Sequence, residues 1–333
     1  LAKLRQASSP PPPAYFDDDS YKGAIVTDSQ FKAQLAALDK RLGDRDDRLG
    51  VGEGVDSVSF NTFKESFAFL AGGRAALLQL AHPFVASALL AHSRLKNSVQ
   101  QRFLNTFKYV FKIMFGTRKE AFAAARHIRG LHVKAHGVVG ESVGGFTPIS
   151  PYAANHTDAL VWVWGTLLES SALMYDIMMT PLTPGERDRL ADSAATGLLL
   201  FGVPAARAPK SWDAFERQCV RMWDDDRVLA VGSAALKMKS YLFTAPSAIA
   251  APGLAWAKLN SAVLLPERIR HAFGMRVTTA TYVTFCGLFG LVRAVYGLLP
   301  RSSRVLTGSL MAEERLGRAH CRPLARLSAF LAN

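Results

Sequence analysis

Cysteine is scarce in this sequence, with 3 among 333 residues. Cys219, Cys286 and Cys321 lie far apart, are odd in number and show no CxxC spacing. A small domain held together by disulfides is therefore excluded, and we expect a compartment that is reducing or indifferent to thiols. The chain does not need such links, because 49% of its residues are hydrophobic and can form a large core.

Signature motifs of the common enzyme classes are also absent. The sequence has no P-loop, no GxGxxG opening a helix, no HExxH and no GxSxG. No zinc-finger, RNP or helix-turn-helix pattern accompanies the basic residues, so we expect no nucleic-acid partner.

Uninterrupted apolar runs are too short to predict a membrane span. Residues 240–257 carry no charge over 18 positions but contain two prolines, and residues 277–292 are uncharged over 16 positions. A spanning helix needs about 20 apolar residues. We expect core helices, or helices lying near a membrane face, and hence a peripheral rather than an integral membrane protein.

Basic residues are in excess and unevenly placed. The chain has 40 Lys and Arg against 27 Asp and Glu, a formal net charge of +13. Residues 1–55 are nearly neutral, whereas residues 94–134 hold ten basic residues and one acid, Glu120. This pattern fits either a solvated basic face or contact with anionic lipid such as cardiolipin, where each surface cation contributes about 1 kcal/mol.

The patterning predicts an all-α fold. Residues 1–55, with Pro10 to Pro13, are expected to form an extended Pro-rich arm, and residues 56–333 a single helical domain of about ten helices. Alternating strand patterns are scarce, and residues 138–156 are expected to be a long loop. We expect helices near residues 62–71, 75–92, 99–115, 118–136, 158–178, 184–201, 212–224, 228–239, 266–273, 278–298 and 309–330.

Local signals support several of these boundaries. Capping boxes are expected at Thr62 with Glu65, Thr117 with Glu120, and Thr183 with Glu186. Gly116 and Gly137 are expected to end helices.

One expected helix is both aromatic and basic. A stripe that repeats every four residues predicts a core face formed by Phe103, Phe107, Phe111 and Phe115. Lys108 and Lys112 each follow a stripe residue and lie off that face. With Arg118 and Lys119 they are our candidate contacts for anionic lipid or an acidic partner.

Candidate polar sites are few. His132 and His136 are four residues apart and could share a metal, but no carboxylate-rich helix completes such a site, so no metal is expected. Arg126, Arg129 and His132 are spaced by three and lie on one helix face. They could bind a carboxylate or propionate, or be merely solvated.

The chain resembles a known family at a series of short motifs in a fixed order. These are Ala81-His82-Pro83-Phe84-Val85-Ala86, Arg102 to Thr106, Phe115-Gly116, His132 within Leu131 to Gly137, Tyr152-Ala153-Ala154, Trp162-Val163, Pro181-Leu182-Thr183, Glu186 to Arg189, and Gly202-Val203-Pro204. Together they resemble the catalytic domain of the ER-bound oxygenase MpaB and of the latex-clearing-protein-like rubber oxygenases, over roughly residues 60–275. The resemblance implies an all-α fold that binds haem b in an apolar core and oxidises hydrophobic, often isoprenoid, substrates.

The positions that would carry this chemistry have changed. In the family the central helix reads roughly Trp-Val-His-Ala-Thr-Leu, and its His is the implied axial ligand of the haem iron. Here Trp164 holds that position, and an indole N–H offers no lone pair to iron. We expect the larger indole to fill the haem space. His156 replaces part of an Asp-Pro pair, and Ser193 replaces an acidic residue.

These departures favour a degenerate, haem-free protein over an enzyme. We expect an accessory or structural subunit of a membrane complex, peripheral at the mitochondrial inner membrane, for instance in an ATP synthase or a respiratory complex. The location is inferred from basicity and from a start at Leu1, which a removed transit peptide would leave. The alternative is a haem b oxygenase with His156 or His132 as ligand. A third hypothesis is a lipid or quinone binder that reuses the pocket.

Overall fold

The computed structural model describes residues 18–92, 107–245 and 247–318. The helices are α1 (Asp18–Gly23), α2 (Asp28–Leu42), η2 (Asp47–Leu49), α3 (Val58–Phe63), η3 (Ser66–Ala71), α4 (Gly72–Leu80), α5 (Pro83–Ala91), α7 (Arg118–Lys134), α8 (Thr157–Met178), α9 (Pro184–Leu199), η4 (Ala205–Arg207), α10 (Trp212–Asp224), α11 (Ser233–Leu242), α12 (Ala251–Leu264), α13 (Glu267–Ala272), α14 (Thr279–Tyr296), α15 (Arg301–Arg304) and α16 (Thr307–Arg315). Residues 107–115 are also helical. Within the described ranges the strands are β1 (His136–Val138) and β2 (Pro151–Ala153), one antiparallel hairpin. The expected all-α class is confirmed.

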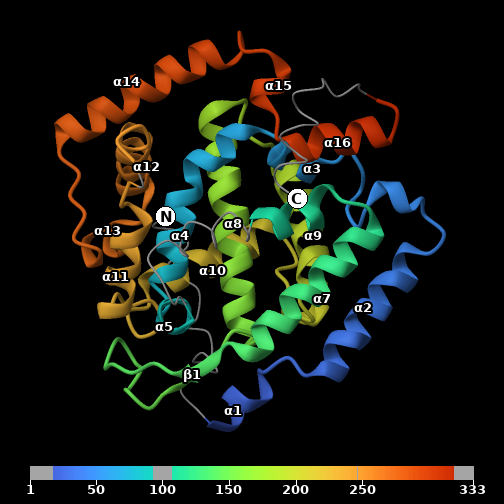
Figure 1. The fold of residues 1–333 in the computed structure, drawn as a ribbon, viewed down its shortest axis with the longest axis horizontal. Coiled ribbons are helices and arrows are strands. Elements are labelled where there is room, and N and C mark those ends of the chain that lie inside the picture. The colour runs from blue at the N-terminus through green and yellow to red at the C-terminus, as the bar shows by residue number, and fades with distance from the viewer. Residues whose placement is uncertain (1–17, 93–106, 246, 319–333) are drawn as a thin grey trace.

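Helix α8 runs through the middle of the molecule (Figure 1). Its buried residues occur on every side of the helix, which is typical of a helix surrounded by protein. It packs against α4 and η3 on one side and against α9 on the other. Because α8 carries Trp164, the position of this helix places the candidate site deep in the fold.

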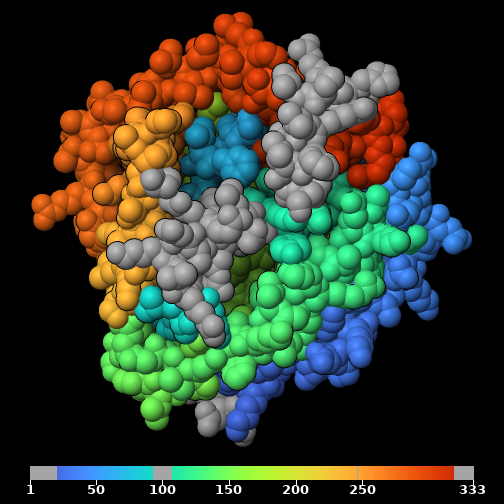
Figure 2. All heavy atoms as spheres, in the orientation of Figure 1, coloured from blue at the N-terminus to red at the C-terminus, as the bar shows by residue number. Residues whose placement is uncertain are grey.

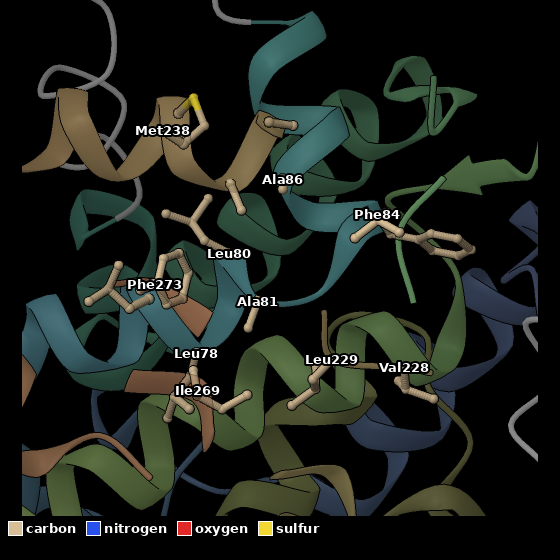
Figure 3. Close-up of a cluster of buried hydrophobic side chains, with 14 of the residues drawn as sticks. Leu78, Leu80, Ala81, Phe84, Ala86, Val228, Leu229, Met238, Ile269 and Phe273 are labelled. Atoms are coloured by element: carbon tan, nitrogen blue, oxygen red, sulfur yellow. The ribbon is translucent and has the colours of Figure 1, made fainter. Parts of the chain in front are cut away.

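The largest hydrophobic cluster lies between α4, α5, α11 and α13 (Figure 3). Leu78 and Phe84 contribute from α4 and α5, Met238 from α11, and Ile269 from α13. Leu78, Ile269 and the neighbouring Phe273 are at most 1% exposed. This cluster holds the helices that flank α8 in place.

Part of the expected arm belongs to the helical core. Helix α2 begins with a capping box between Thr27 and Gln30 and buries one apolar face against the second hydrophobic cluster. The buried residues on this face are Phe31, Leu35, Leu38 and Leu42. The expectation of an extended segment reaching residue 55 is therefore corrected, because this three- and four-residue spacing forms an amphipathic helix. Pro10 to Pro13 lie outside the described residues.

Two of the three expected capping boxes are present. Thr117 with Glu120 begins α7, and Thr183 with Glu186 begins α9. The third is wrong: Thr62 is buried within α3. Glu65 makes no cap bond and instead accepts a 2.7 Å hydrogen bond from the hydroxyl of Tyr296.

The expected loop over residues 138–156 contains the β1–β2 hairpin instead. Gly137 lies in β1 and does not end a helix, since α7 ends at Lys134 with Ala135 as its C-cap. A Cβ at Gly137 would lie 2.9 Å from the hydroxyl of Tyr152 on β2. Glycine is therefore used there for close strand contact.

Proline positions explain two further differences between the observed and the expected helices. The expected helix 75–92 is divided into α4 and α5, which meet at a bend of 98° where Pro83 begins α5. Helix α12 begins within the uncharged residues 240–257 and continues beyond them, although the predicted helix ranges contain none there. Its Pro252 does not break the helix. It lies in the first turn, where a missing N–H costs nothing. The expected helices 99–115 and 309–330 lie partly outside the described residues.

Candidate functional site

An apolar cavity lies beside α8. The centre of a water molecule can reach about 130 Å³ of it, and the wider space free of protein atoms, which includes open solvent, is about 1300 Å³. Residues from α3, η3, α8, α9, α16 and the helical segment 107–115 line it. Phe69 and Phe107 form part of its wall, with ring centroids 5.0 Å apart, and Phe111 lies 5.9 Å from Phe69. The aromatic stripe is therefore part core and part cavity wall, with Phe115 buried and Phe103 outside the described residues.

The cavity wall contains few polar groups, and those away from its two arginines are uncharged. Ser170, Ser193 and Thr196 contribute hydroxyls, and no carboxylate is present among the described lining residues. The two cations in the wall, Arg48 and Arg315, are engaged by protein groups. Arg48 pairs with a neighbouring carboxylate, and Arg315 donates to the carbonyl of Phe115 at 2.8 Å. Such a wall suits an uncharged, apolar molecule.

Trp164 lies at the edge of this cavity. Its indole N–H donates to the carbonyl oxygen of Ala194 at 3.1 Å, and its ring contacts Phe201 with centroids 5.4 Å apart. A Cβ at Gly197 of α9 would lie 2.9 Å from the indole Cε2. Because Gly197 has no side chain, the indole lies down against α9. Trp164 therefore forms part of the cavity wall, and the expectation that the larger indole fills the haem space stays a prediction.

The residues around this cavity do not fit a haem. Trp164, which the motif resemblance predicts to stand at the ligand position, offers no lone pair, and its indole N–H donates to Ala194. Among the described lining residues there is no His, Cys or Tyr, and Met114 is the one possible axial donor. Methionine acts as a haem ligand in cytochromes together with a His, and no His accompanies Met114 in this wall. We derive no chemistry through a haem here.

His156 lies elsewhere in the core. It is fully buried at the start of α8, where its ring packs against Tyr21 and Phe84 with centroids 5.1 and 5.8 Å away. Burial, with a smaller contribution from the charge of Arg207, lowers its pKa to about 4. His156 is thus a neutral core imidazole, and it does not line the cavity beside Trp164.

The predicted polar face of Arg126, Arg129 and His132 does not form one site in the structure. Arg129 pairs with Asp28 of α2 at 2.9 Å and lies with its guanidinium 5.6 Å from the ring centre of Phe31. His132 shares a small separate cavity with Arg129, and burial followed by the Arg129 charge lowers its pKa to about 4. Arg126 is exposed. Of these three residues the structure therefore brings together only Arg129 and His132. Asp28 occupies the place beside Arg129 that the carboxylate of a ligand would need.

The expected pairing of His132 with His136 on one helix is wrong. His136 lies in β1, after α7 has ended, and is exposed. No group of three or more His, Cys, Asp or Glu side chains in the described ranges could hold a metal ion.

The proposed basic contacts differ in their surroundings. Arg118 donates to the carbonyl of Gly43 at 2.8 Å and lies 3.5 Å from a carboxylate oxygen of Asp47, so its charge is used within the fold. Lys119 is exposed, and Lys108 and Lys112 are half-buried on the segment 107–115.

A buried ion pair next to the cavity was missed by the sequence analysis. Arg74 of α4 is 2% exposed and donates to Glu169 of α8 at 2.9 Å, to Ser170 at 2.7 Å and to the carbonyl of Leu264 at 2.8 Å. An arginine as the one charged residue of the mostly apolar helix Gly72–Leu80 was the available signal.

The fold and the cavity define an all-α protein with an apolar chamber beside its central helix. The chain belongs to the family of the ER-bound oxygenase mpaB/B' and rubber oxygenase catalytic domain, whose model matches residues 62–294. Comparisons with curated proteins and with solved structures returned no match.

Proposed function

We propose that this chain is a haem-free member of its family that acts as an accessory or structural subunit of a membrane protein complex. The observation that carries this proposal is the fixed indole of Trp164 at the position that the motif resemblance predicts for the ligand. An axial ligand is indispensable for a protein-held haem. The fold thus keeps the family's architecture without a group to bind its cofactor, which leaves a scaffold role.

The surface supports a membrane location. The net charge of +13 attracts anionic lipid such as cardiolipin, which is abundant in the mitochondrial inner membrane. Lys108, Lys112 and Lys119 lie on and beside the segment 107–115. We therefore propose a peripheral position at that membrane, in an assembly such as an ATP synthase or a respiratory complex.

Two measurements on native protein test this proposal. An absorption spectrum should lack a Soret band, and the chain should migrate with a membrane complex on a native gel. A Soret band near one haem per chain would favour the alternative, a haem b oxygenase acting on a hydrophobic isoprenoid or lipid. Migration as a free single chain would contradict the subunit role.

The cavity favours a second candidate function, the binding of a lipid or quinone. Its aromatic wall and neutral hydroxyls suit a long apolar molecule with a small uncharged polar end. Native mass spectrometry should show the chain with a bound hydrophobic mass. Replacing Ala75 of the wall by Phe should reduce the fraction of chains that carry the bound mass. The control change Ala123→Phe, on the exposed face of α7, should not. Full retention of the bound mass in Ala75→Phe would contradict this candidate.

A further inference from the structure

Helix α14 is apolar on two opposite faces. Its inner face buries Phe285 and Phe289, which pack together with ring centroids 4.5 Å apart in a cluster shared with η3, α8 and α12. Its outer face is exposed and still apolar, with Val283 and Leu291 each 64% exposed. Figure 2 shows α14 in orange along the upper edge of the molecule. The apolar outer residues on and just after α14 are Tyr282, Val283, Leu288, Leu291, Val295, Leu298 and Leu299.

The chain's own core does not explain this composition. Among the described helices, α14 is the one single straight helix that is long and apolar enough to cross a membrane. Only 17% of it is buried, however. A core helix of the same length and apolar composition would be mostly buried. A continuous exposed apolar face of this kind marks a surface that another apolar phase covers.

The surrounding charges indicate what that phase is. Between Glu267 and Glu313 the sequence contains no acidic residue. Arg276 before α14 and Arg293 within its last turns are both exposed, whereas Arg301 after it is paired with the Glu313 carboxylate. Cations at both ends of an apolar face about 27 Å long complement the phosphates of a lipid surface.

We propose that the outer face of α14 rests on an anionic lipid bilayer, a proposal that builds on the membrane location proposed above. The inner face is held by Phe285 and Phe289 in the protein, so the helix lies in the plane of the membrane interface and does not cross it. Val283 and Leu291 enter the acyl region, while Tyr282 and the flanking arginines lie at headgroup level.

The chain carries its own reporter position for this proposal. Cys286 is exposed on α14, whereas Cys219 is buried and burial raises the pKa of its thiol, so Cys219 reacts poorly. In the full chain with the change Cys321→Ser, an environment-sensitive fluorophore can be attached at Cys286. Vesicles of phosphatidylcholine with phosphatidylglycerol should shift its emission to the blue, and brominated lipid should quench it. Phosphatidylcholine alone, or high salt, should weaken both effects.

Matched variants locate the contact. Leu291→Asp should abolish the blue shift, because it places a charge in the proposed acyl region. Val138→Asp changes an equally apolar residue, 56% exposed, on β1 at the opposite end of the molecule in Figure 1, and should leave the shift intact. Circular dichroism of both variants verifies that they fold.

Three results would overturn the inference. They are no shift with either vesicle, an unchanged shift in Leu291→Asp, and a shift that rises with protein concentration in the absence of vesicles. The last result would assign the face to a second copy of the chain. If the label stays in water while native protein migrates haem-free with a membrane complex, this inference fails and the proposed function stands. If the label inserts while the protein carries haem or migrates alone, the proposed function fails and the bilayer contact stands.

Discussion

The indole of Trp164 on α8 lies so close to Gly197 on α9 that residue 197 has no room for a side chain. A Cβ at residue 197 would lie 2.9 Å from the indole Cε2 and closer still to Cζ2. The indole lies against α9 and donates to the carbonyl of Ala194, and Trp164, Ala194 and Gly197 together form one part of the cavity wall.

Gly197→Ala should therefore destabilise the fold. The added methyl group would overlap the indole and force α8 and α9 apart, at a cost of about 1–3 kcal/mol in the free energy of unfolding. Urea denaturation measures this cost. Gly130→Ala on α7 is the control, since a Cβ there meets nothing within 4 Å. In the double variant with Trp164→Ala the cost of Gly197→Ala should disappear; if it persists, the indole is not what the methyl group meets.

Trp164→His tests whether the indole alone prevents haem binding on reconstitution with haem b. Residue 164 lines the cavity, and imidazole supplies the lone pair that the indole lacks. A Soret band approaching one haem per chain in this variant, with none in the parent protein, would show that only the ligand is missing. Trp162→His is the control, because Trp162 is buried in the main core and donates to the carbonyl of Leu78. No band in Trp164→His would mean that the cavity cannot hold the macrocycle.

Glu169→Ala should be strongly destabilising. It would leave the guanidinium of Arg74, whose side chain is 3% exposed, without its carboxylate partner. Breaking a buried ion pair by removing one partner costs about 3–5 kcal/mol. Asp213→Ala removes the partner of Arg217 in an exposed pair, where the expected loss is below about 1 kcal/mol. Equal losses in chemical denaturation would show that the burial of Arg74 has no energetic consequence.

Acid should destabilise the protein through three histidines whose pKa is lowered by burial. Burial lowers the pKa of His82 to about 3 and of His132 and His156 to about 4, whereas the unfolded side chains titrate near 6.5. Below about pH 6.5 the unfolded chain binds more protons than the folded chain, so the free energy of unfolding falls with falling pH. Each histidine contributes up to about 1.4 kcal/mol per pH unit.

Urea titrations between about pH 7 and pH 5 measure this slope. His156→Gln should flatten it by about a third, since His82 and His132 continue to contribute. His271→Gln should leave it unchanged, because His271 is exposed on α13. A parent protein whose stability is constant over this range would refute the assignment of these imidazoles as neutral groups in the fold.

Leu38→Ala should show that α2 is part of the core. Leu38 is fully buried, and removal of a buried leucine side chain costs about 2–5 kcal/mol. Lys40→Ala, an exposed change on the same helix, should cost less than about 0.5 kcal/mol. A Leu38→Ala protein as stable as the parent would restore the view of this segment as a detachable arm.

Short-range signals were interpreted correctly where their chemistry is local. The capping boxes at Thr117 and Thr183 need only residues three positions apart. The same logic failed at Glu65, because the hydroxyl of Tyr296, more than 200 residues away in the chain, donates a hydrogen bond to its carboxylate. The burial of α2 was not predicted, although Leu35, Leu38 and Leu42 repeat at helical spacing, because the Pro-rich start of the chain favoured an extended arm up to residue 55.

By itself the sequence determined the helical class and the family, because residue identity and order along the chain suffice for each; the replacement of an iron ligand by Trp164 stays a prediction. The tertiary structure alone decided where that indole lies, since it packs where Gly197 of α9 has no side chain and donates to Ala194. It also decided that Asp28 neutralises Arg129 and that the outer face of α14 has no cover from the described chain. Those outcomes depend on contacts between distant segments, which no local pattern contains.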